Sequence, residues 1–510
     1  MPSWNFQSIG LWFYFIVMSA IVTGVYAVCE FFEGEEEYLF TKISASICAV
    51  IVVVMIIVSI FSWEIFRAND YKNIISVSEE GDFNKDIPKV KESKDIPIVD
   101  MLTAQKLGDR TMGEMEKYSS QYEVNDEYNL ISYKGSFYRI SPTEYDGFFK
   151  YLNSKERGIP GYVLVDIYTQ EATFVKVDEG IKYSPSAHFD KLLKRHLRKN
   201  YPSYIFGKEQ FEIDEQGVPF FIVPVYKTTI GLFGGYEVDR VILVNAISGE
   251  TTEKALEDVP NWVDHVFSVS YLMEKLNWHY SYVNGFWNSS IFGPKKDVRK
   301  TSYSFDQNQY YFIAREDGIY LYNGITSAGK DESNYGFLLA NVRTGEVKYY
   351  SNPGAEESSA QASAEGVVQQ YGYKAGPVML VNIDGIETYF MTLKDNQLLV
   401  KKVALVNKKN YTIAVVEDTI EQAINSYRDK FSIEERAELI EASGVISELY
   451  SAIKNGNTNY YFKLKNDNKL YVSSIVNNEQ QVTMKIGDSI SLKFVQVDEK
   501  LAIVEKIVIK

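Results

Sequence analysis

The chain has 510 residues, a formal net charge of −15 and 38 tyrosines. Its length exceeds that of one compact core and predicts about three or four domains. Because a nucleic-acid binder needs a basic surface to neutralise phosphates, the acidic balance argues against that role. The two cysteines, Cys29 and Cys48, both lie near the N-terminus. A disulfide framework and a cysteine-based zinc site are therefore excluded from the rest of the chain.

Two apolar runs without charged residues, Ile9–Cys29 and Ile43–Trp63, lie near the N-terminus. As a helix, each run would extend about 30 Å, which matches the hydrocarbon core of a bilayer. Aromatic residues cluster near the ends of both runs, as they do at membrane interfaces. Two buried core helices, or a signal peptide over the first run, are the alternatives, but residues 1–8 carry no Lys or Arg. We therefore predict a two-helix transmembrane anchor over residues 1–67.

The basic residues beside the two runs bear on which side of the membrane the rest of the chain occupies. The hairpin between the runs is acidic and holds one basic residue, Lys42, whereas Arg67 and Lys72 follow the second run. Because cytoplasmic segments are enriched in Lys and Arg, this count favours a cytoplasmic location. The difference is one residue, so the charge pattern alone leaves the side open.

Residues 68–97 are predicted to form a linker. They mix charges with few large apolar residues, and Pro88 and Pro97 interrupt any helix. Asp100 is then a suitable N-cap for a helix that extends to about Lys117.

From residue 98 to residue 430, a unit of one helix, one hairpin and a further pair of strands recurs. In the second pair a strand ends on Asp or Asn and leads into a tight turn, at Asp166, Asn245 and Asn341. The Asp or Asn side chain satisfies turn amides, and Gly, where present, takes the positive φ that the turn needs. A fourth, degenerate copy surrounds Asn407. The spacing of about 80–95 residues between turns predicts a repeat of small α+β units.

Each unit also has an expected first hairpin and an expected helix. The hairpin turns lie at 133–135, 214–217 and 384–385. Besides the helix after Asp100, helices are expected over 187–199, 269–278 and 358–371.

The helix, the hairpin and the strand that ends in the pattern V-D-x-x-T-G-E resemble PepSY-type domains. The longer pattern, over roughly residues 68–430, is similar to a family of bacterial membrane-anchored proteins with PepSY-like repeats. The stretches that carry it are L-G-D-R at 107–110, M-G-E at 112–114, G-I-K-Y-S at 180–184, T-I-G-L-F-G-G at 229–235, N-G-F-W-N at 284–288, D-E-S-N-Y-G-F at 331–337 and S-A-E-G at 363–366.

The resemblance implies an architecture and no particular activity. It implies PepSY-like units 1 and 2 over 98–260 and units 3 and 4 over 261–430. PepSY-type domains are often extracytoplasmic and are thought of as binding or inhibitory modules. The resemblance therefore favours an extracytoplasmic location for the soluble part, against the charge count.

Residues 431–510 differ from the units. A short helix or linker is expected over 431–442, followed by five or six short strands that resemble a small OB-like β-barrel. The strands are expected to begin at 444 and to cover 459–464, 469–473, 481–484, 489–497 and 501–509. OB folds often bind nucleic acid, but this segment has ten basic and eleven acidic residues and no electrostatic attraction for phosphates. We therefore expect a structural barrel and no nucleic-acid partner.

The sequence contains no catalytic or metal-binding spacing, so no catalytic, cofactor-binding or metal-binding residue is predicted. The four histidines form no HExxH pattern, and no P-loop lysine follows the glycines at 231–235. Carboxylates near the loops of the units, Asp331, Glu332 and Glu365, are most simply solvated charges. They leave open an alternative function as a membrane-bound hydrolase or peptidase regulator.

Two surface patches are the predicted contact sites. The first is a basic helical stretch that suits anionic lipid headgroups or an acidic partner, although a solvated helix face is the simpler interpretation. Its residues are Lys191, Lys194, Arg195, Arg198 and Lys199. The second is an aromatic loop that suits a protein partner, or that closes a core between units. Its residues are Tyr282, Phe286, Trp287 and Phe292.

These features together predict a membrane-anchored α+β protein with two N-terminal transmembrane helices, PepSY-like units and a C-terminal OB-like β-barrel. The predicted function is a non-catalytic, membrane-tethered binding or scaffold protein of the bacterial cell envelope. Its expected partners are the lipid bilayer and a protein, and no cofactor is expected.

Overall fold

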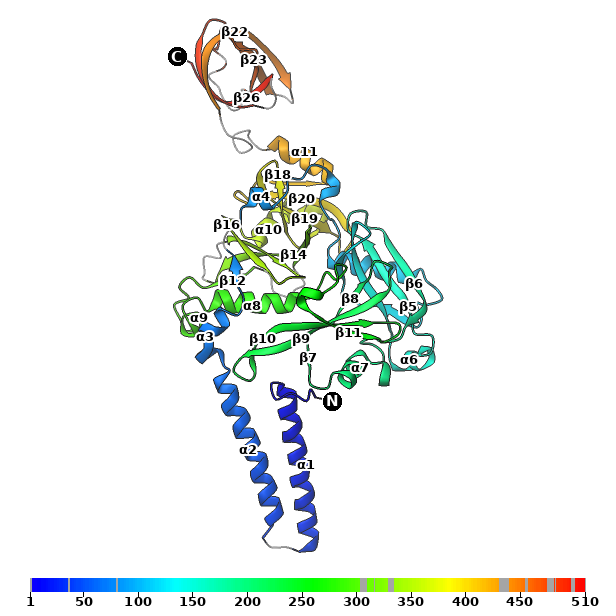
Figure 1. Ribbon diagram of the computed structural model, residues 1–510. Coiled ribbons are helices and arrows are strands. Elements are labelled where there is room, and N and C mark those ends of the chain that lie inside the picture. Colours follow the sequence, from blue (N-terminus) through cyan, green and yellow to red (C-terminus); the bar gives the residue numbers. More distant parts are fainter. Residues whose placement is uncertain are drawn as a thin grey trace.

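The computed structural model describes residues 2–34, 37–78, 81–302, 310–315, 317–328, 334–430, 440–454, 457–474, 481, 483–496 and 500–509. Two helices, α1 (Ile9–Glu33) and α2 (Leu39–Phe61), form a hairpin that projects from the rest of the molecule (Figure 1). Both helices are long and apolar enough to cross a membrane, and few of their residues are buried. The prediction of two apolar helices of membrane-spanning length is thus confirmed.

The body that follows contains four sheets with one pairing pattern. In each sheet a short first strand pairs with a long third strand, and the second strand forms a hairpin with that third strand. The third, fourth and fifth strands are neighbours in chain order, and all of these pairs are antiparallel. We refer to the four groups as unit 1 (100–181), unit 2 (184–255), unit 3 (268–354) and unit 4 (356–417).

The elements of each unit follow in chain order. Unit 1 contains α5 (Met101–Gly113), β2 (Tyr122–Val124), β3 (Asn129–Tyr133), β4 (Ser136–Tyr145), α6 (Phe148–Ser154), β5 (Ile159–Asp166) and β6 (Ala172–Ile181). Unit 2 contains η2 (Phe189–Lys191), α7 (Leu193–Asn200), β7 (Ile205–Phe206), β8 (Gln210–Ile213), β9 (Pro219–Ile230), β10 (Gly234–Asn245) and β11 (Thr251–Ala255), and η3 (Leu256–Asp258) follows it.

Units 3 and 4 complete the body. Unit 3 contains α8 (Val269–Ser281), α9 (Phe286–Ser289), β12 (Arg299–Thr301), β13 (Tyr311–Arg315), β14 (Gly318–Ser327), β15 (Asn334–Asn341) and β16 (Val347–Gly354). Unit 4 contains α10 (Glu357–Val367), η5 (Gln369–Tyr371), β17 (Lys374–Ala375), β18 (Met379–Ile383), β19 (Ile386–Lys394), β20 (Val400–Asn407) and β21 (Ala414–Glu417), and α11 (Ile420–Lys430) follows it.

The turns after β5, β10 and β15 have the chemistry that the sequence predicts. The Asp166 carboxylate accepts two backbone N–H groups of its turn, and the side-chain oxygens of Asn245 and Asn341 do the same. Gly249 and Gly345 have φ of +79° and +75°, in the left-handed region that glycine adopts without strain. These side chains replace the backbone partners that a tight turn leaves unsatisfied.

The residue after the Asp or Asn ties each turn to the segment that precedes the helix of the same unit. In unit 1 the Ile167 carbonyl accepts the N–H groups of Ile98 and Val99, at 2.9 and 3.2 Å. The corresponding carbonyls are those of Ala246, which accepts from residues 182 and 183, of Val342, which accepts from residues 266 and 267, and of Lys408, which accepts from Ala355. One backbone contact therefore recurs in all four units.

Residues 68–97, which we expected to form a linker, pack against the body instead. They contain most of α3 (Glu64–Lys72), together with β1 (Val77–Ser78), α4 (Phe83–Asp86) and η1 (Ser93–Asp95). β1 adds a parallel strand to β16. The side chains that anchor the segment are Phe83, Ile87, Val90 and Ile96, all buried. Phe83, Ile87 and Val90 have helical spacing, but Pro88 interrupts the run, so the sequence does not mark the segment as part of a core.

Unit 3 lies between two hydrophobic cores. One face of its sheet, which includes Leu321 and Leu338, joins the core shared with units 1 and 2. The opposite face, which includes Tyr322 and Leu339, joins the core shared with unit 4. A strand buried on both faces has a continuous apolar sequence, as Phe337–Ala340 does. Units 1 to 3 thus share one core, which spans the boundary expected at residue 260.

The body is fastened to α2 through Ser62, the residue that follows the helix. The Ser62 hydroxyl accepts the N–H groups of Leu232 and Phe233 at 3.1 and 3.2 Å, in the turn between β9 and β10. The Ser62 carbonyl accepts the hydroxyl of Tyr71 at 2.8 Å. A β-carbon at Gly234 would lie 2.2 Å from that hydroxyl, so the turn requires glycine there. Polar contacts therefore set the angle at which α2 enters the body.

The segment before α1 is fastened to unit 2. The backbone N–H of Trp4 donates to the Pro202 carbonyl at 2.8 Å, and the Ser3 hydroxyl donates to the Tyr204 carbonyl at 3.0 Å. The body thus holds the hairpin both before the start of α1 and after the end of α2.

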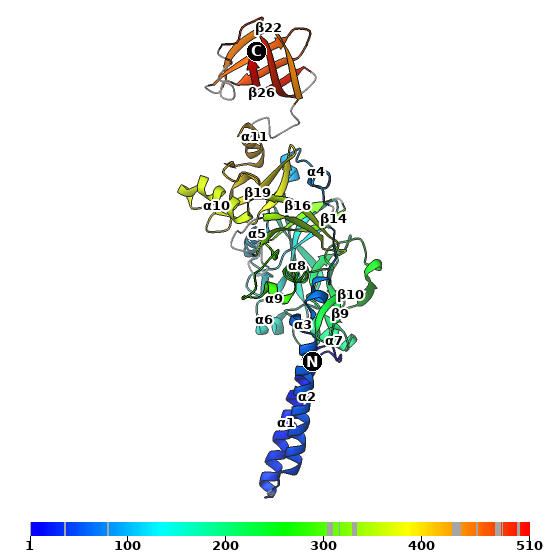
Figure 2. The same ribbon diagram turned by 90° about the vertical axis from the view of Figure 1, so that its left-hand side faces the viewer.

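The C-terminal strands are β22 (Ile440–Lys454), β23 (Asn457–Leu464), β24 (Leu470–Ser474), β25 (Ser489–Gln496) and β26 (Leu501–Ile509). They close into a barrel in the order β22-β23-β24-β26-β25, at the end of the body away from α1 and α2 (Figures 1 and 2). Residues 440–442, expected in a helix or linker, belong to β22, and residues 431–439 lie outside the described residues. The described residues of the strand expected over 481–484 are not in a strand.

A buried ion pair links unit 1 to unit 4. The Asp100 carboxylate caps α5 by accepting the Thr103 N–H at 2.9 Å, and it also pairs with the Lys394 ammonium of β19. The side chains of Lys394 and Asp100 are 4% and 2% exposed. Each of these buried charges would be left without a partner if units 1 and 4 moved apart. The pair therefore favours the observed packing of the two units.

Replacement of Lys394 by Met is expected to lower the free energy of unfolding by about 3–5 kcal/mol, because the Asp100 carboxylate would stay buried without its partner. The matched control is Lys401→Met. Lys401 also pairs with an aspartate, Asp395, but the Lys401 side chain is 40% exposed. That change should cost less than about 1 kcal/mol. Urea denaturation of the full chain in detergent measures both, and equal losses would contradict the assigned role of the buried pair.

Candidate functional site

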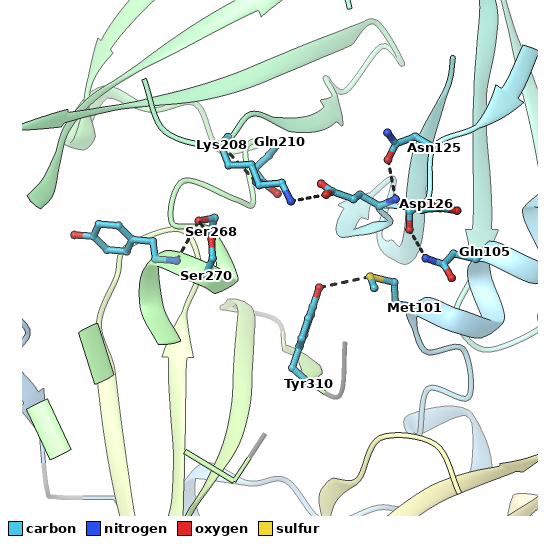
Figure 3. A network of polar contacts seen from close by, with 11 residues as sticks. Met101, Gln105, Asn125, Asp126, Lys208, Gln210, Ser268, Ser270 and Tyr310 are labelled. Carbon is cyan, nitrogen blue, oxygen red and sulfur yellow. Dashed lines mark hydrogen bonds and ion pairs between the residues drawn. The ribbon is translucent and has the colours of Figure 1, made fainter. Parts of the chain in front are cut away.

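A cavity of about 230 Å³, lined by both polar and apolar groups, lies where units 1, 2 and 3 meet. Unit 1 contributes Gln105 of α5 and the loop 126–129 before β3, and unit 2 contributes Lys208 and Gln210 at the start of β8. Unit 3 contributes the first residues of α8 and the rings of Tyr310 and Phe312. Figure 3 shows side chains from these three directions around the same space. No single unit builds this cavity, so it exists only when the units pack together.

The rim between units 1 and 2 is a chain of polar contacts (Figure 3). The Gln105 amide donates to the Asp126 carbonyl at 2.5 Å, and the Asn125 side chain accepts the Glu127 N–H at 2.7 Å. The Glu127 carboxylate pairs with the Lys208 ammonium across the unit boundary. These side chains keep the loop 126–129 in place beside the cavity.

The opposite wall comes from unit 3. Ser268 caps α8 by accepting the Tyr271 N–H at 3.3 Å, and the Ser268 and Ser270 hydroxyls lie 3.1 Å apart. The Tyr310 hydroxyl donates to the Met101 sulfur at 3.5 Å, and burial raises the pKa of Tyr310. The wall therefore offers hydroxyl groups and an aromatic face, which suit a small ligand with polar and apolar parts.

A buried arginine supports the cavity from behind. The Arg139 side chain is 2% exposed, and its guanidinium donates to the Tyr128 carbonyl at 3.2 Å. The same group lies 5.5 Å from the centre of the Phe312 ring, within cation–π distance. Burial lowers the pKa of Arg139, and nearby Tyr310 and Tyr311 oppose that shift. Arg139 thus supports the backbone of Tyr128 and the ring of Phe312, two residues of the lining.

Two buried carboxylates and a histidine lie at the junction of units 1, 2 and 3. The Glu212 carboxylate accepts the N–H groups of Asp264 and His265 at 2.8 and 2.7 Å, and Asp264 accepts the Ser132 N–H at 2.6 Å. The His265 Nε2 donates to the Leu130 carbonyl at 2.7 Å. Burial raises the pKa of Glu212 and raises that of Asp264 to about 7, and it lowers the pKa of His265 to about 4. These side chains join the backbone of residues 130–132 and of residues 264–265 to β8, so their role is to hold the three units together.

A second cavity, of about 490 Å³, contains Lys275 of α8 in its wall. The Lys275 ammonium is buried and has no hydrogen-bond partner among the described residues. It lies 4.1, 4.4 and 5.1 Å from the ring centres of Tyr236, Tyr271 and Trp278. Burial lowers its pKa to about 8. Three aromatic faces therefore stabilise the charge in place of oxygen acceptors.

The predicted aromatic loop divides into buried and exposed parts. Tyr282 is buried, and its hydroxyl donates to Glu64 at 2.5 Å, while Phe286 packs beside it against α3. Trp287 and Phe292 are 71% and 96% exposed, and neighbouring Ile291 is 90% exposed. Tyr282 and Phe286 thus close a core between α3 and α8, and Trp287 and Phe292 are the accessible part.

The predicted basic stretch is also divided. The helix is shorter than expected, because 187–192 contain only the short η2 before α7 begins at Leu193. Lys191 donates to the Tyr183 hydroxyl at 2.9 Å, and Arg198 donates to the Pro202 and Tyr204 carbonyls. The exposed members are Lys194, Arg195 and Lys199. Three of the five predicted residues are thus available for a contact.

Of the three carboxylates considered for the alternative function, the structure describes one, Glu365. Glu365 is in α10 and accepts the Lys374 ammonium at 2.8 Å and the Ala375 N–H at 3.0 Å, so it holds α10 to β17. Asp331 and Glu332 lie outside the described residues. Within the described ranges, no group of three or more His, Cys, Asp and Glu side chains is placed to hold a metal ion.

No protein-family model matches the chain, and no curated protein matches it. Among solved structures, a chain titled "Structural mimicry for functional antagonism" is similar over 24% of this chain and 82% of its own length, with 13% identity and a TM-score of 0.12. The Ifi202 HINa domain in complex with 20bp dsDNA is similar over 26% and 93%, with 14% identity and a TM-score of 0.11. Such low TM-scores carry no weight for fold or function.

The buried Asp264 carboxylate predicts a pH-dependent stability. Its pKa is raised by burial to about 7, so its contribution to stability is full below its ordinary pKa and is lost as the pH rises through 7. Asp264→Asn keeps an acceptor for Ser132 and removes the charge. The stability of the wild type relative to this variant should fall by up to about 1.4 kcal/mol per pH unit between pH 5 and 7.

Urea denaturation of both chains across this pH range measures the difference. His265 acts with the opposite sign, because its pKa is lowered, and it is present in both chains. The charge of Asp264 also raises the pKa of Glu212, so the measured difference belongs to the Asp264–Glu212 pair. A difference that stays constant with pH would contradict a buried, ionisable Asp264.

Proposed function

We propose that this protein is a non-catalytic binding or scaffold protein of the bacterial cell envelope, inserted in the membrane through α1 and α2. The four sheets are, in this proposal, copies of one PepSY-like unit, and the closed five-stranded barrel is an OB-like module. The shared pairing pattern and the recurring turn-to-helix contact support common descent of the units. The resemblance favours an extracytoplasmic body.

The observation that carries the proposal is the cavity between units 1, 2 and 3. It is assembled from three units, its rim is held by amide and ion-pair contacts, and its charged supports are engaged with backbone groups. A cavity with this lining orients a bound group by hydrogen bonds. Recognition of a protein segment or of a small polar ligand is the chemistry that fits.

The attachment of the body to the hairpin supports a scaffold role. Contacts at Ser62 and at residues 3–5 hold the body in one orientation relative to α1 and α2. The barrel lies at the opposite end of the body (Figure 1). A partner that binds the body would therefore be held at a set distance from the bilayer.

The test is a pair of serine substitutions. Ser270 is the second residue of α8 and borders the cavity, and Ser358 is the second residue of α10 on the exposed surface. Ser270→Trp fills the cavity mouth, whereas Ser358→Trp adds the same ring at an equivalent helix position elsewhere. Melting temperatures of both variants equal to that of the wild type would show that neither disrupts the fold.

Full-length chains are crosslinked in cells, and the attached proteins are quantified by mass spectrometry. We expect at least one crosslinked partner to fall about tenfold with Ser270→Trp, which corresponds to 1.4 kcal/mol of binding free energy, and to persist with Ser358→Trp. The same set of partners at the same level for both variants would contradict the cavity as a binding site.

A further inference from the structure

A patch of exposed apolar and basic side chains covers α6, η2 and α7. We call residues 146–157 and 188–200 the foot. Phe148, Phe149 and Leu152 of α6 are 42%, 78% and 37% exposed, and Phe189 of η2 is 52% exposed. Large apolar side chains gathered on one surface mark an interaction site more often than scattered ones do.

The foot lies at the end of the body from which α1 emerges. Residues 3–5 bond to residues 202–204, which directly follow α7, and α1 begins at Ile9. Figures 1 and 2 both place α6 and α7 at this lower end of the body, with α7 beside the N-terminus. The foot is therefore close to the level at which α1 would enter a bilayer.

The aromatic side chains of the foot are held together in their exposed positions. The Phe148 ring centre lies 6.1 Å from that of Phe189 and 5.1 Å from that of His188. Phe189 has φ of +57°, a conformation that its β-carbon disfavours. Such strain persists where the surrounding structure imposes it, which is frequent at binding surfaces. The foot thus presents a preformed apolar edge.

The charge of the foot is opposite to that of the whole chain. Its two segments contain eight basic and three acidic residues, in a protein with a net charge of −15. Of the acidic residues, Asp146 pairs with Lys150, and the others are Glu156 and Asp190. The exposed bases of α7 are Lys194, Arg195 and Lys199. Basic side chains beside exposed aromatic rings are the pattern of a surface that lies on anionic lipid.

We propose that the foot rests on the leaflet in which α1 begins, with Phe149 and Phe189 among the headgroups and the bases of α7 against anionic lipid phosphates. This inference rests on the proposed insertion of α1 and α2. It adds a peripheral contact that stops the body from tilting on its hairpin. The foot also explains why an acidic protein keeps a local cluster of basic and aromatic side chains at this end.

The test places a fluorophore on the foot of the full chain. Cys29→Ala and Cys48→Ala remove the native thiols, and Phe149→Cys introduces a single labelling position. The matched control is Tyr371→Cys, because Tyr371 is an aromatic residue of unit 4 with 56% exposure. Both chains are reconstituted in vesicles of equal parts phosphatidylcholine and phosphatidylglycerol that contain nitroxide-labelled lipid.

We expect the label at 149 to be quenched at least about twofold more than the label at 371. Charge reversal by Lys194→Glu, Arg195→Glu and Lys199→Glu, or vesicles of phosphatidylcholine alone, should reduce that excess, because each base near an anionic surface contributes attraction. Equal quenching at the two positions would overturn the inference. If the extra quenching at 149 were unchanged by the charge reversal and by the lipid composition, the anionic-lipid contact would be overturned and a purely apolar contact favoured.

Carbonate extraction of the same vesicles separates this inference from the proposed function. Release of the full chain by carbonate would overturn the membrane insertion itself. Retention of the chain with a water-exposed label at 149 would overturn the foot alone. A label at 149 that becomes protected only when cell extract is added would also overturn it, in favour of an acidic protein partner.

Discussion

The junction at Ser62 is the constraint on which the arrangement of the molecule depends. An apolar helix ends there, and its last backbone groups must find partners before the chain enters the body. The Ser62 hydroxyl and carbonyl meet the turn between β9 and β10 and the hydroxyl of Tyr71. Gly234 lies so close to Ser62 and Tyr71 that a β-carbon would not fit there. The absence of a side chain at Gly234 therefore allows the chain next to the turn to lie against the end of α2. The body is consequently held against its anchor rather than joined to it by a free tether.

Above that junction, stability comes from contacts that pass between units. Unit 3 is buried on both faces of its sheet, so it connects the core of units 1 and 2 with that of unit 4. The pair of Asp100 with Lys394 adds a connection across the same body. Units 1 to 4 are therefore joined to one another by buried contacts. Such packing keeps the three units that line the cavity in fixed positions relative to one another.

Local signals account for what the sequence predicts well. The two long apolar helices follow from uninterrupted apolar runs. The turns follow from Asp166, Asn245 and Asn341, whose side chains bond to backbone groups only two and three residues further along the chain. Features that depend on distant residues are not visible in this way. The cavity joins Gln105, Lys208 and Ser270, which share no motif and no spacing. The packing of residues 68–97 likewise depends on surfaces that the sequence presents only after folding.

The predicted contact patches show the same limit in more detail. Residue type identified the aromatic loop and the basic helix, but it did not separate Tyr282, which bonds to Glu64, from Phe292, which is exposed. It also missed α6, because residue type does not distinguish its exposed phenylalanines from core residues. Exposure of a large apolar residue is a property of the assembled surface, so composition cannot assign it.

Labelling of cysteines from one side of the membrane tests the central claim, that the hairpin of α1 and α2 crosses the bilayer and the body stays on one side. In a chain without native thiols, Glu33→Cys marks the hairpin and Ser358→Cys marks the body. An impermeant maleimide applied to intact cells should label one of the two, and lysis should expose the other. The labelled position identifies the side of the body, and the proposal predicts Ser358→Cys. Labelling of both positions in intact cells, or of neither until lysis, would show that the hairpin does not cross the membrane.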